Sequence, residues 1–183
     1  VVVPFCGVDW TNPQLDSIST IGVRGYVECV EWSPCGRFLA SGSDDTLVSI
    51  WGFDSVTRRW KKVTKFEGCT FRVVSVSWSP CGKFLVSGSY DNTVRVWSFD
   101  SETSQGEEVV KFQGHTNWVT SVVWSPCGKF LASGSYDGAV CIWSFCTKTR
   151  KGKQVAKFEG HTNWILSVAW SPCGEFIVSG SFD

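Results

Sequence analysis

The chain has 183 residues, and its 17 basic and 17 acidic side chains leave it without net charge when histidine is neutral. This balance argues against a broad electrostatic field for nucleic acid or a membrane surface. No apolar run reaches the roughly 18 residues that cross a membrane, and the first stretch lacks the charged start of a signal peptide. We therefore expect neither a membrane partner nor a secretory leader.

A five-residue motif, Trp-Ser-Pro-Cys-Gly, divides the chain into units. It recurs at a constant step of 46 residues, at Trp32–Gly36, Trp78–Gly82, Trp124–Gly128 and Trp170–Gly174. A fixed period of this length is the signature of stacked or radial repeats. The period predicts complete units at 23–68, 69–114 and 115–160, the first half of a fourth at 161–183, and a separate N-terminal segment at 1–22.

The N-terminal segment gives a weaker signal. Pro4 and Pro13 restrict any strand in its first part to the edge of a sheet. When the repeat is shifted back by one period, Ile18–Gly22 aligns with Thr64–Gly68, so Ser17–Ile21 reads as a fourth strand without its own first three. We expect this strand to complete another unit.

The third unit shows the pattern of every unit most fully. Short runs rich in Val and aromatic residues predict four strands, at Trp118–Trp124, Phe130–Ser135, Val140–Trp143 and Gln154–Phe158. The segments after each third strand (54–60, 100–107 and 146–153) are polar and predict surface loops. One sheet per unit cannot cover both of its own faces, and radial packing of several sheets solves this problem.

The repeats resemble those of WD-repeat (WD40) β-propellers over about residues 15–183. The resemblance rests on Gly114-His115 and Gly160-His161, on the turn aspartates, and on the tryptophans that close each third strand (Asp45, Asp91, Asp137, Asp183; Trp51, Trp97, Trp143). It implies an all-β WD40 β-propeller, here a partial ring of about three and a half four-stranded blades. Since such rings usually have about seven blades, the chain would supply about half of one, and we expect it to be an internal piece of a longer reading frame.

Serine, histidine and aspartate occur together in blade three, as they do in hydrolases. The family comparison implies a structural role instead, in which His115, Ser133, Asp137 and Trp143 form a hydrogen-bonded tetrad. Donors and acceptors alternate in this set, and each group would be costly to bury unpaired. Ser135 lies on the same face as Ser133, so the sequence leaves open which hydroxyl takes part.

Blades one and two depart from the tetrad. The histidine position is occupied by Val23 in blade one and by Cys69 in blade two, and neither can replace an imidazole bridge. We therefore expect both blades to be less stable than blade three, and Cys69→His to raise the unfolding midpoint.

Positions at which the repeats disagree are better candidates for function, because copied residues mainly build the blade. The family comparison implies that three such rows face one rim of the propeller, where peptides and partner proteins dock. The rows are Tyr26, Arg72, Trp118 and Trp164; Glu28, Val74, Thr120 and Leu166; and Asp44, Tyr90, Tyr136 and Phe182. Aromatic residues and arginine are typical of binding hot spots. The alternative is that Trp118 and Trp164 only shield the joint between blades.

The cysteines and basic runs favour less specific interpretations. Four of the nine cysteines repeat one turn position, and the other five show no CxxC spacing (Cys35, Cys81, Cys127, Cys173; Cys6, Cys29, Cys69, Cys141, Cys146). We expect free thiols in a reducing compartment, the cytoplasm or nucleus, with no metal and no cofactor. Basic runs at 58–62 and 148–153 could contact phosphates, but they are more typical of solvated loop tips, so nucleic acid is an unlikely partner.

These observations predict a non-enzymatic scaffold or adaptor that binds protein or peptide partners and supports complex assembly. An enzyme would need converging polar groups at the channel mouth, where this sequence places aromatic residues. A narrower alternative is an adaptor of cytosolic iron–sulfur protein assembly, because WSPCG followed by FLAS, and Ile50–Gly52, are similar to the propeller of that machinery. Similar blades could also substitute for one another, so self-association to complete the ring is a further possibility.

Overall fold

The computed structural model describes residues 21–23 and 25–183. The N-terminal segment up to residue 20, with all but the last residue of the expected blade-closing strand Ser17–Ile21, lies outside the described residues.

Fourteen strands and no helix make up the described part of the chain. The first sheet contains β1 (Val27–Trp32), β2 (Phe38–Ser43), β3 (Val48–Asp54) and β4 (Arg59–Phe66). The second contains β5 (Val73–Trp78), β6 (Phe84–Ser89), β7 (Thr93–Ser98) and β8 (Glu108–Gln113). The third contains β9 (Val119–Trp124), β10 (Phe130–Ser135), β11 (Ala139–Cys146) and β12 (Lys151–Glu159). The fourth contains β13 (Ile165–Trp170) and β14 (Ile177–Ser181).

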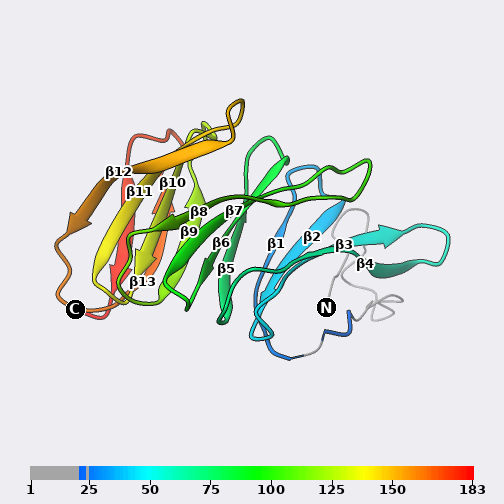
Figure 1. The fold of residues 1–183 in the computed structure, drawn as a ribbon, viewed down its shortest axis with the longest axis horizontal. Helices are drawn as coiled ribbons and strands as arrows, with labels where there is room; N and C mark the ends of the chain where they lie inside the picture. Colours follow the sequence, from blue (N-terminus) through cyan, green and yellow to red (C-terminus); the bar gives the residue numbers. More distant parts are fainter. Residues whose placement is uncertain (1–20, 24) are drawn as a thin grey trace, which may run out of the picture.

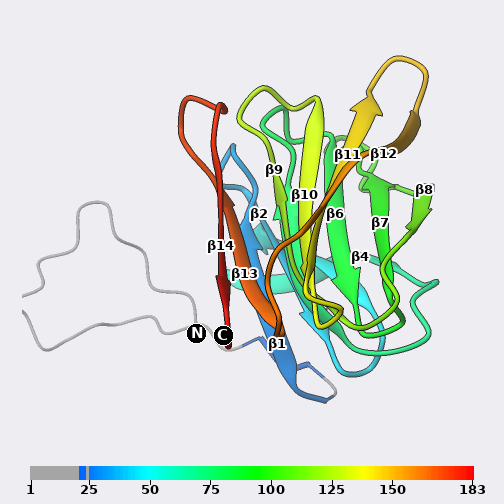
Figure 2. The ribbon, with the colours of Figure 1, turned by 90° about the vertical axis from the view of Figure 1, so that its left-hand side faces the viewer.

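Each sheet is an antiparallel meander in which neighbours in sequence are neighbours in space. The four sheets stand side by side like the blades of a fan, with β1, β5, β9 and β13 in contact along one side (Figures 1 and 2). The expectation of an all-β partial propeller with about three and a half four-stranded blades is therefore confirmed.

The repeated WSPCG motif forms the turn between the first two strands of every blade. In blade one the Ser33 hydroxyl accepts a hydrogen bond from the Phe38 N–H at 3.0 Å, and Gly36 has a φ of +69° that few other residues tolerate. The same serine-to-backbone bond closes the equivalent turn in each later blade, again at 3.0 Å. The serine and the glycine of the motif thus stabilise the backbone conformation of the turn.

Two of the three predicted surface loops are shorter than expected. Strand β3 runs to Asp54 and β4 begins at Arg59, and β11 runs to Cys146 while β12 begins at Lys151. Part of each basic run therefore lies in strand β4 or β12. Tight turns are possible here because Arg58 and Arg150 take a positive φ, at 51° and 55°.

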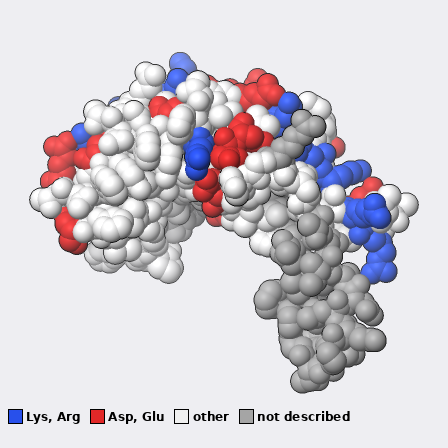
Figure 3. All heavy atoms as spheres, turned by 90° about the horizontal axis from the view of Figure 1, so that it is seen from below, with Lys and Arg blue, Asp and Glu red and all other residues white. Residues whose placement is uncertain are grey.

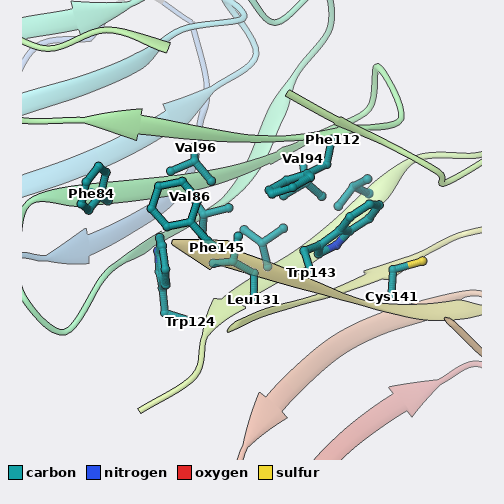
Figure 4. Close-up of a cluster of buried hydrophobic side chains, with 12 residues drawn as sticks. Phe84, Val86, Val94, Val96, Phe112, Trp124, Leu131, Cys141, Trp143 and Phe145 are labelled. Atoms are coloured by element: carbon teal, nitrogen blue, oxygen red, sulfur yellow. The ribbon is translucent and has the colours of Figure 1, made fainter. Parts of the chain in front are cut away.

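The core lies between the blades. One cluster joins the first and second sheets, a second joins the second and third, and a third joins the third and fourth. Figure 4 shows the middle cluster, in which Phe84 and Val86 of β6 meet Trp124 of β9 and Leu131 of β10. Because each cluster uses side chains from two sheets, neighbouring blades stabilise one another.

Candidate partner-binding rim

The four tetrad residues of blade three come together in one hydrogen-bonded chain. Trp143 donates its Nε1–H to Ser133 Oγ at 2.8 Å, Ser133 Oγ lies 2.7 Å from His115 Nε2, and His115 Nδ1 lies 2.9 Å from Asp137 Oδ2. An indole N–H can only donate, so Ser133 accepts from Trp143 and gives its own proton to His115. His115 must then carry its proton on Nδ1 and donate it to Asp137.

The charge states of the pair follow from burial. Burial lowers the pKa of His115, against the attraction of Asp137, so the imidazole is neutral. Burial alone would raise the pKa of Asp137, but N–H groups of Thr116 and Ala139, together with His115, hold it below its usual value. The contact is therefore a hydrogen bond between a neutral histidine and a carboxylate, which pins the loop before β9 to the turn after β10.

Ser135, the other serine of this face, has different partners. Its hydroxyl donates to the Asn117 carbonyl at 3.0 Å and accepts from the Asp137 N–H at 3.0 Å. The model thus places Ser133 in the tetrad and Ser135 in the turn. Both serines are fully buried. A substrate could not reach the Ser133 hydroxyl, whose bonds are already taken by Trp143 and His115.

Blade two replaces the histidine bridge with an ion cluster in which Arg95 and Asp91 are buried and Glu108 reaches the surface. Arg95 of β7 lies 3.3 Å from Asp91 and 2.5 Å from Glu108 of β8, and its side chain is 5% exposed. Cys141, the residue equivalent to Arg95 in blade three, lies 3.9 Å from His115 Nδ1. Arg95 therefore borders the histidine position, and it gives Asp91 the partner that Cys69 cannot supply. Sequence reasoning missed this residue.

The other two blades keep different parts of the tetrad. In blade one Trp51 donates to Ser41 at 2.9 Å, while Asp45 accepts from the Ser43 hydroxyl and the Leu47 N–H. In blade four His161 lies 2.8 Å from both Asp183 and Ser179.

Six aromatic side chains from blades two to four meet at one end of the sheets. Tyr90 and Trp118 stack with ring centroids 4.3 Å apart and planes within 8°, and Tyr136 and Trp164 stack at 4.4 Å and 6°. Trp118 and Tyr136 join the two pairs at 5.5 Å. We call this set the aromatic rim, and its members are Phe71, Tyr90, Trp118, Tyr136, Trp164 and Phe182.

Phe71 is a member of the aromatic rim that sequence reasoning missed. It lies 6.4 Å from Tyr90 and 6.5 Å from Trp118. The equivalent residues Asn117 and Asn163 accept from the next N–H in the chain. An aromatic residue at a position held by asparagine in two blades was the available signal.

The remaining predicted rim residues do not form a second cluster. Tyr26 is 76% exposed and has no stacking partner within residues 21–183. Asp44 accepts from the Tyr26 N–H at 2.8 Å, and Arg72 pairs with Glu28 at 3.4 Å. The Thr120 hydroxyl contacts the carbonyl oxygens of Ile165 and Gly134, so it serves the joint between blades three and four.

Two further rim positions differ in exposure. Val74 is half-buried, whereas Leu166 is exposed. The structure thus brings together the aromatic members of the predicted rows in blades two to four, leaves Tyr26 outside the cluster, and holds the polar members in local contacts.

The end that carries the aromatic rim is poor in charge over blades three and four. The C terminus, directly after Phe182, lies at the lower end of the sheets in Figure 1. Seen from this end, uncharged atoms cover most of the left-hand part, and charged side chains lie along the edges (Figure 3). Lys and Arg gather at the right, over the β3–β4 hairpin.

Three basic groups of the two predicted runs have partners within the chain. Lys61 pairs with Asp54 at 3.4 Å, and the Lys62 ammonium lies 4.8 Å from the ring centre of Trp51. Arg150 pairs with Glu107 of the neighbouring blade at 2.9 Å.

A groove of about 980 Å³ lies between the WSPCG turns of blades one and two, and both Cys35 and Cys81 line it. A hydrogen bond from the Ser33 hydroxyl lowers the pKa of Cys35. Within residues 21–23 and 25–183, no three His, Cys, Asp or Glu side chains form a group that could hold a metal ion.

Comparisons with known proteins place these repeats in a family. The sequence of the chain matches the family described as WD domain, G-beta repeat, at residues 16–52, 60–98, 106–144 and 152–183. These matches cover most of the chain, which therefore belongs to the WD40 repeat family. The resemblance seen in the sequence is confirmed. Proteins of this family generally act as protein-interaction scaffolds and are generally not enzymes.

Curated relatives match over short segments. The WD repeat-containing protein 26 homolog of Arabidopsis thaliana is 42% identical over 48 residues, which are 26% of this chain and 8% of that protein. The WD40 repeat-containing protein HOS15 of the same plant is 36% identical over 56 residues, 31% of this chain and 9% of that protein. Protein HIR1 of Cryptococcus neoformans is 36% identical over 76 residues, 34% of this chain and 8% of that protein. The chain thus spans 8 or 9% of these relatives.

Solved structures share the fold over a larger part. A structure of U3-55K and a crystal structure of the RRP9 WD40 repeats each superpose with a TM-score of 0.68 at 20% identity. Each match covers 81% of this chain and 43% of the other. At this identity the likeness concerns the fold. No helix in the part of the chain that the model describes is long and apolar enough to cross a membrane.

Proposed function

We propose that this chain is part of a non-enzymatic scaffold that binds protein or peptide partners through the aromatic rim and supports complex assembly. The observation that carries this proposal is the convergence of six aromatic side chains from three blades on one surface. Trp and Tyr are enriched among residues that dominate interface energies, because they bury a large area and also carry a polar group.

The competing explanation is that these rings only seal the joints between blades. Trp118 is 39% exposed and Trp164 is 45% exposed, so a large part of each ring contacts solvent rather than the joint. Val119 and Ile165, the residues that follow them, are fully buried and fill the joints themselves. The exposed ring area is available to a partner.

An enzyme or a nucleic-acid-binding propeller remains a weaker alternative. The Ser133–His115 pair is buried and its hydrogen bonds are taken, so it offers no free nucleophile. The ion pairs of Lys61 and Arg150 reduce the positive charge offered to phosphates. Both observations favour the scaffold.

Selection from a random peptide library tests the proposal. Peptides would be selected on the wild-type chain and measured on the triple variant Trp118→Ala, Tyr136→Ala and Trp164→Ala, with Trp60→Ala on outer strand β4 as the control. We expect the selected peptides to lose about tenfold or more in affinity for the triple variant, a loss typical of hot-spot removal. Equal binding to a folded triple variant would show that the rim is not the docking surface. An unfolded triple variant would favour the joint-sealing role.

We further propose self-association, because the two end faces, on blades one and three, expose side chains whose equivalents in blade two are buried. Val30 in blade one is 60% exposed, whereas its equivalent Val76 is 7% exposed. Phe158 in blade three is 59% exposed, whereas its equivalent Phe112 is 4% exposed. Each end face therefore resembles one half of an existing joint, and a second copy of the chain would supply the other half. Light scattering would then show a discrete oligomer, and a stable monomer would contradict this.

The cellular location and pathway are proposals of the same kind. Eight cysteines in the described part of the chain are free, which suits the reducing cytoplasm or nucleus. The adaptor role in iron–sulfur protein assembly stays a prediction.

A further inference from the structure

The backbone of the aromatic rim offers few donors to a partner. The N–H groups of Trp118 and Trp164 donate to Asn117 and Asn163, each at 2.8 Å. Those of Tyr90, Tyr136 and Phe182 donate to carbonyl oxygens across the blade at 2.9 to 3.0 Å. Because these groups are used, the rim cannot take up an added β-strand, and it cannot capture a terminal carboxylate with its backbone.

The charged groups beside the rim are also satisfied. Arg72 pairs with Glu28, and Asp91, Asp137 and Asp183 each accept the N–H of a threonine in the loop that they hold. Recognition of a phosphorylated or acidic segment requires a cluster of arginines. Among the described residues, Arg72 is the arginine beside the rim, and it is already paired with Glu28, so neither kind of segment suits this surface.

The groups that remain are side-chain donors on exposed aromatic rings. Within residues 21–23 and 25–183, neither the Trp118 nor the Trp164 indole N–H has a hydrogen-bond acceptor. An indole N–H donates and never accepts. The surface therefore combines apolar rings with donors, and its best partner presents apolar groups together with free acceptors.

A polyproline II segment has this complementary chemistry. Its backbone carbonyl groups make no internal hydrogen bonds, proline has no backbone N–H, and the proline rings are apolar. Aromatic-lined surfaces recognise such segments elsewhere for these reasons. An amphipathic helix fits less well, because its carbonyl groups are bonded within the helix and would leave the two indole N–H groups unpaired. We propose, resting on the function proposed above, that the aromatic rim binds a proline-rich segment in the polyproline II conformation.

The test uses the ¹⁵N-labelled chain and a synthetic oligoproline of about twelve residues, or about four turns of polyproline II. Trp118→Phe and Trp164→Phe keep an aromatic ring in each stack while removing the indole N–H. Each variant also loses one NMR signal, which identifies the indole N–H of that residue among those of the eleven tryptophans. Trp60→Phe is the matched control. A Gly-Ser peptide, a glutamate-rich peptide and an alanine-based helical peptide of equal length serve as probes for other kinds of partner.

We expect the oligoproline to shift the Trp118 and Trp164 indole N–H signals and to leave the Trp60 signal unchanged. The Trp118→Phe/Trp164→Phe variant should bind it about tenfold more weakly, because two carbonyl groups lose their donors. The inference would be overturned by indole signals that do not move, or by equal affinity in the double variant. If the helical or acidic peptide shifts them and the oligoproline does not, the inference fails while the rim remains a docking surface. If peptides from the library selection bind elsewhere, the proposed function itself fails.

Discussion

The guanidinium of Arg95 lies 3.3 Å from the carboxylate of Asp91, and their side chains are 5% and 6% exposed. The turn aspartates of blades two and three each accept a threonine N–H and so anchor the loop before the first strand of their blade. Arg95 fixes this aspartate in blade two, and His115 fixes its equivalent, Asp137, in blade three. The same loop is thus anchored by an ion pair in blade two and by a hydrogen bond to a neutral histidine in blade three.

Removing the guanidinium should therefore destabilise blade two. Arg95→Ala would leave the buried Asp91 carboxylate without its cation, a loss that typically costs about 3–5 kcal/mol. Arg72→Ala is the control, because its pair with Glu28 is exposed and should contribute at most about 1 kcal/mol. Denaturant midpoints measure both, and equal shifts in the two variants would refute the role of Arg95.

The ion cluster also changes the prediction for Cys69→His. Because Cys141, the equivalent of Arg95, lies 3.9 Å from His115, an imidazole at position 69 would crowd Arg95 and compete with it for Asp91. We now expect Cys69→His alone to lower the unfolding midpoint. The double variant Cys69→His/Arg95→Cys, which copies blade three, should restore it. A single variant that is more stable than the wild type would support the simpler expectation from the sequence.

Ser133 should be the critical hydroxyl of blade three. Ser133→Ala leaves both the Trp143 N–H and the His115 Nε2 buried without a partner, at a cost of about 2–4 kcal/mol. Ser144→Ala, which removes a hydroxyl from an exposed hydrogen bond of β11, is the control. Hydrogen exchange of the β10 and β11 amides would report the loss, and unchanged protection would show that the tetrad adds little.

A pH dependence is expected from the joint between blades one and two. Burial raises the pKa of Glu31 from 4.5 to about 7, although the Trp78 N–H and the Ser77 hydroxyl act in the opposite direction. Because the folded state holds this proton more tightly than the unfolded state, the contribution of Glu31 to stability is fully present below about pH 4.5 and is lost as the pH rises through about 7.

Glu31→Gln keeps an acceptor for Trp78 and cannot ionise. We expect its thermal midpoint to match the wild type near pH 5 and to exceed it near pH 8. His115 cannot produce this pattern. Its lowered pKa favours protonation in the unfolded state, so its contribution is lost as the pH falls. An equal difference between variant and wild type at both pH values would contradict the assignment to Glu31.

Much of the fold could be predicted because the same repeat motif occurs four times in the sequence. A constant period, a glycine turn in each copy and recurring valine-rich runs specify the blades, and a repeated hydrogen-bond pattern then suggests the tetrad. Arg95 was not predicted because it occurs in one blade only, and the equivalent residue is serine in blade one and cysteine in blade three. The signal was a charge between Val94 and Val96, in a strand whose other residues are almost all apolar or small.

The aromatic rim was predictable only in part. Rows that differ between repeats identified Tyr90, Trp118, Tyr136, Trp164 and Phe182, and the structure brings their rings together. The same rows also included Thr120 and Asp44, whose contacts serve the joint or a local turn. The position of a residue in the repeat predicts at which end of the sheet it lies. Whether its side chain stacks on a residue of the neighbouring blade depends on side-chain geometry, which the repeat period does not determine.

The most direct test of the central claim is site-specific photo-crosslinking of the full-length protein in cells. A photoreactive phenylalanine derivative would replace Trp118 in the aromatic rim or, as the control, Trp60 on outer strand β4. We predict crosslinks to a discrete partner from position 118 and none to that partner from position 60. Crosslinks to the same partner with equal yield from both positions, or from position 60 alone, would contradict a scaffold that binds through its aromatic rim.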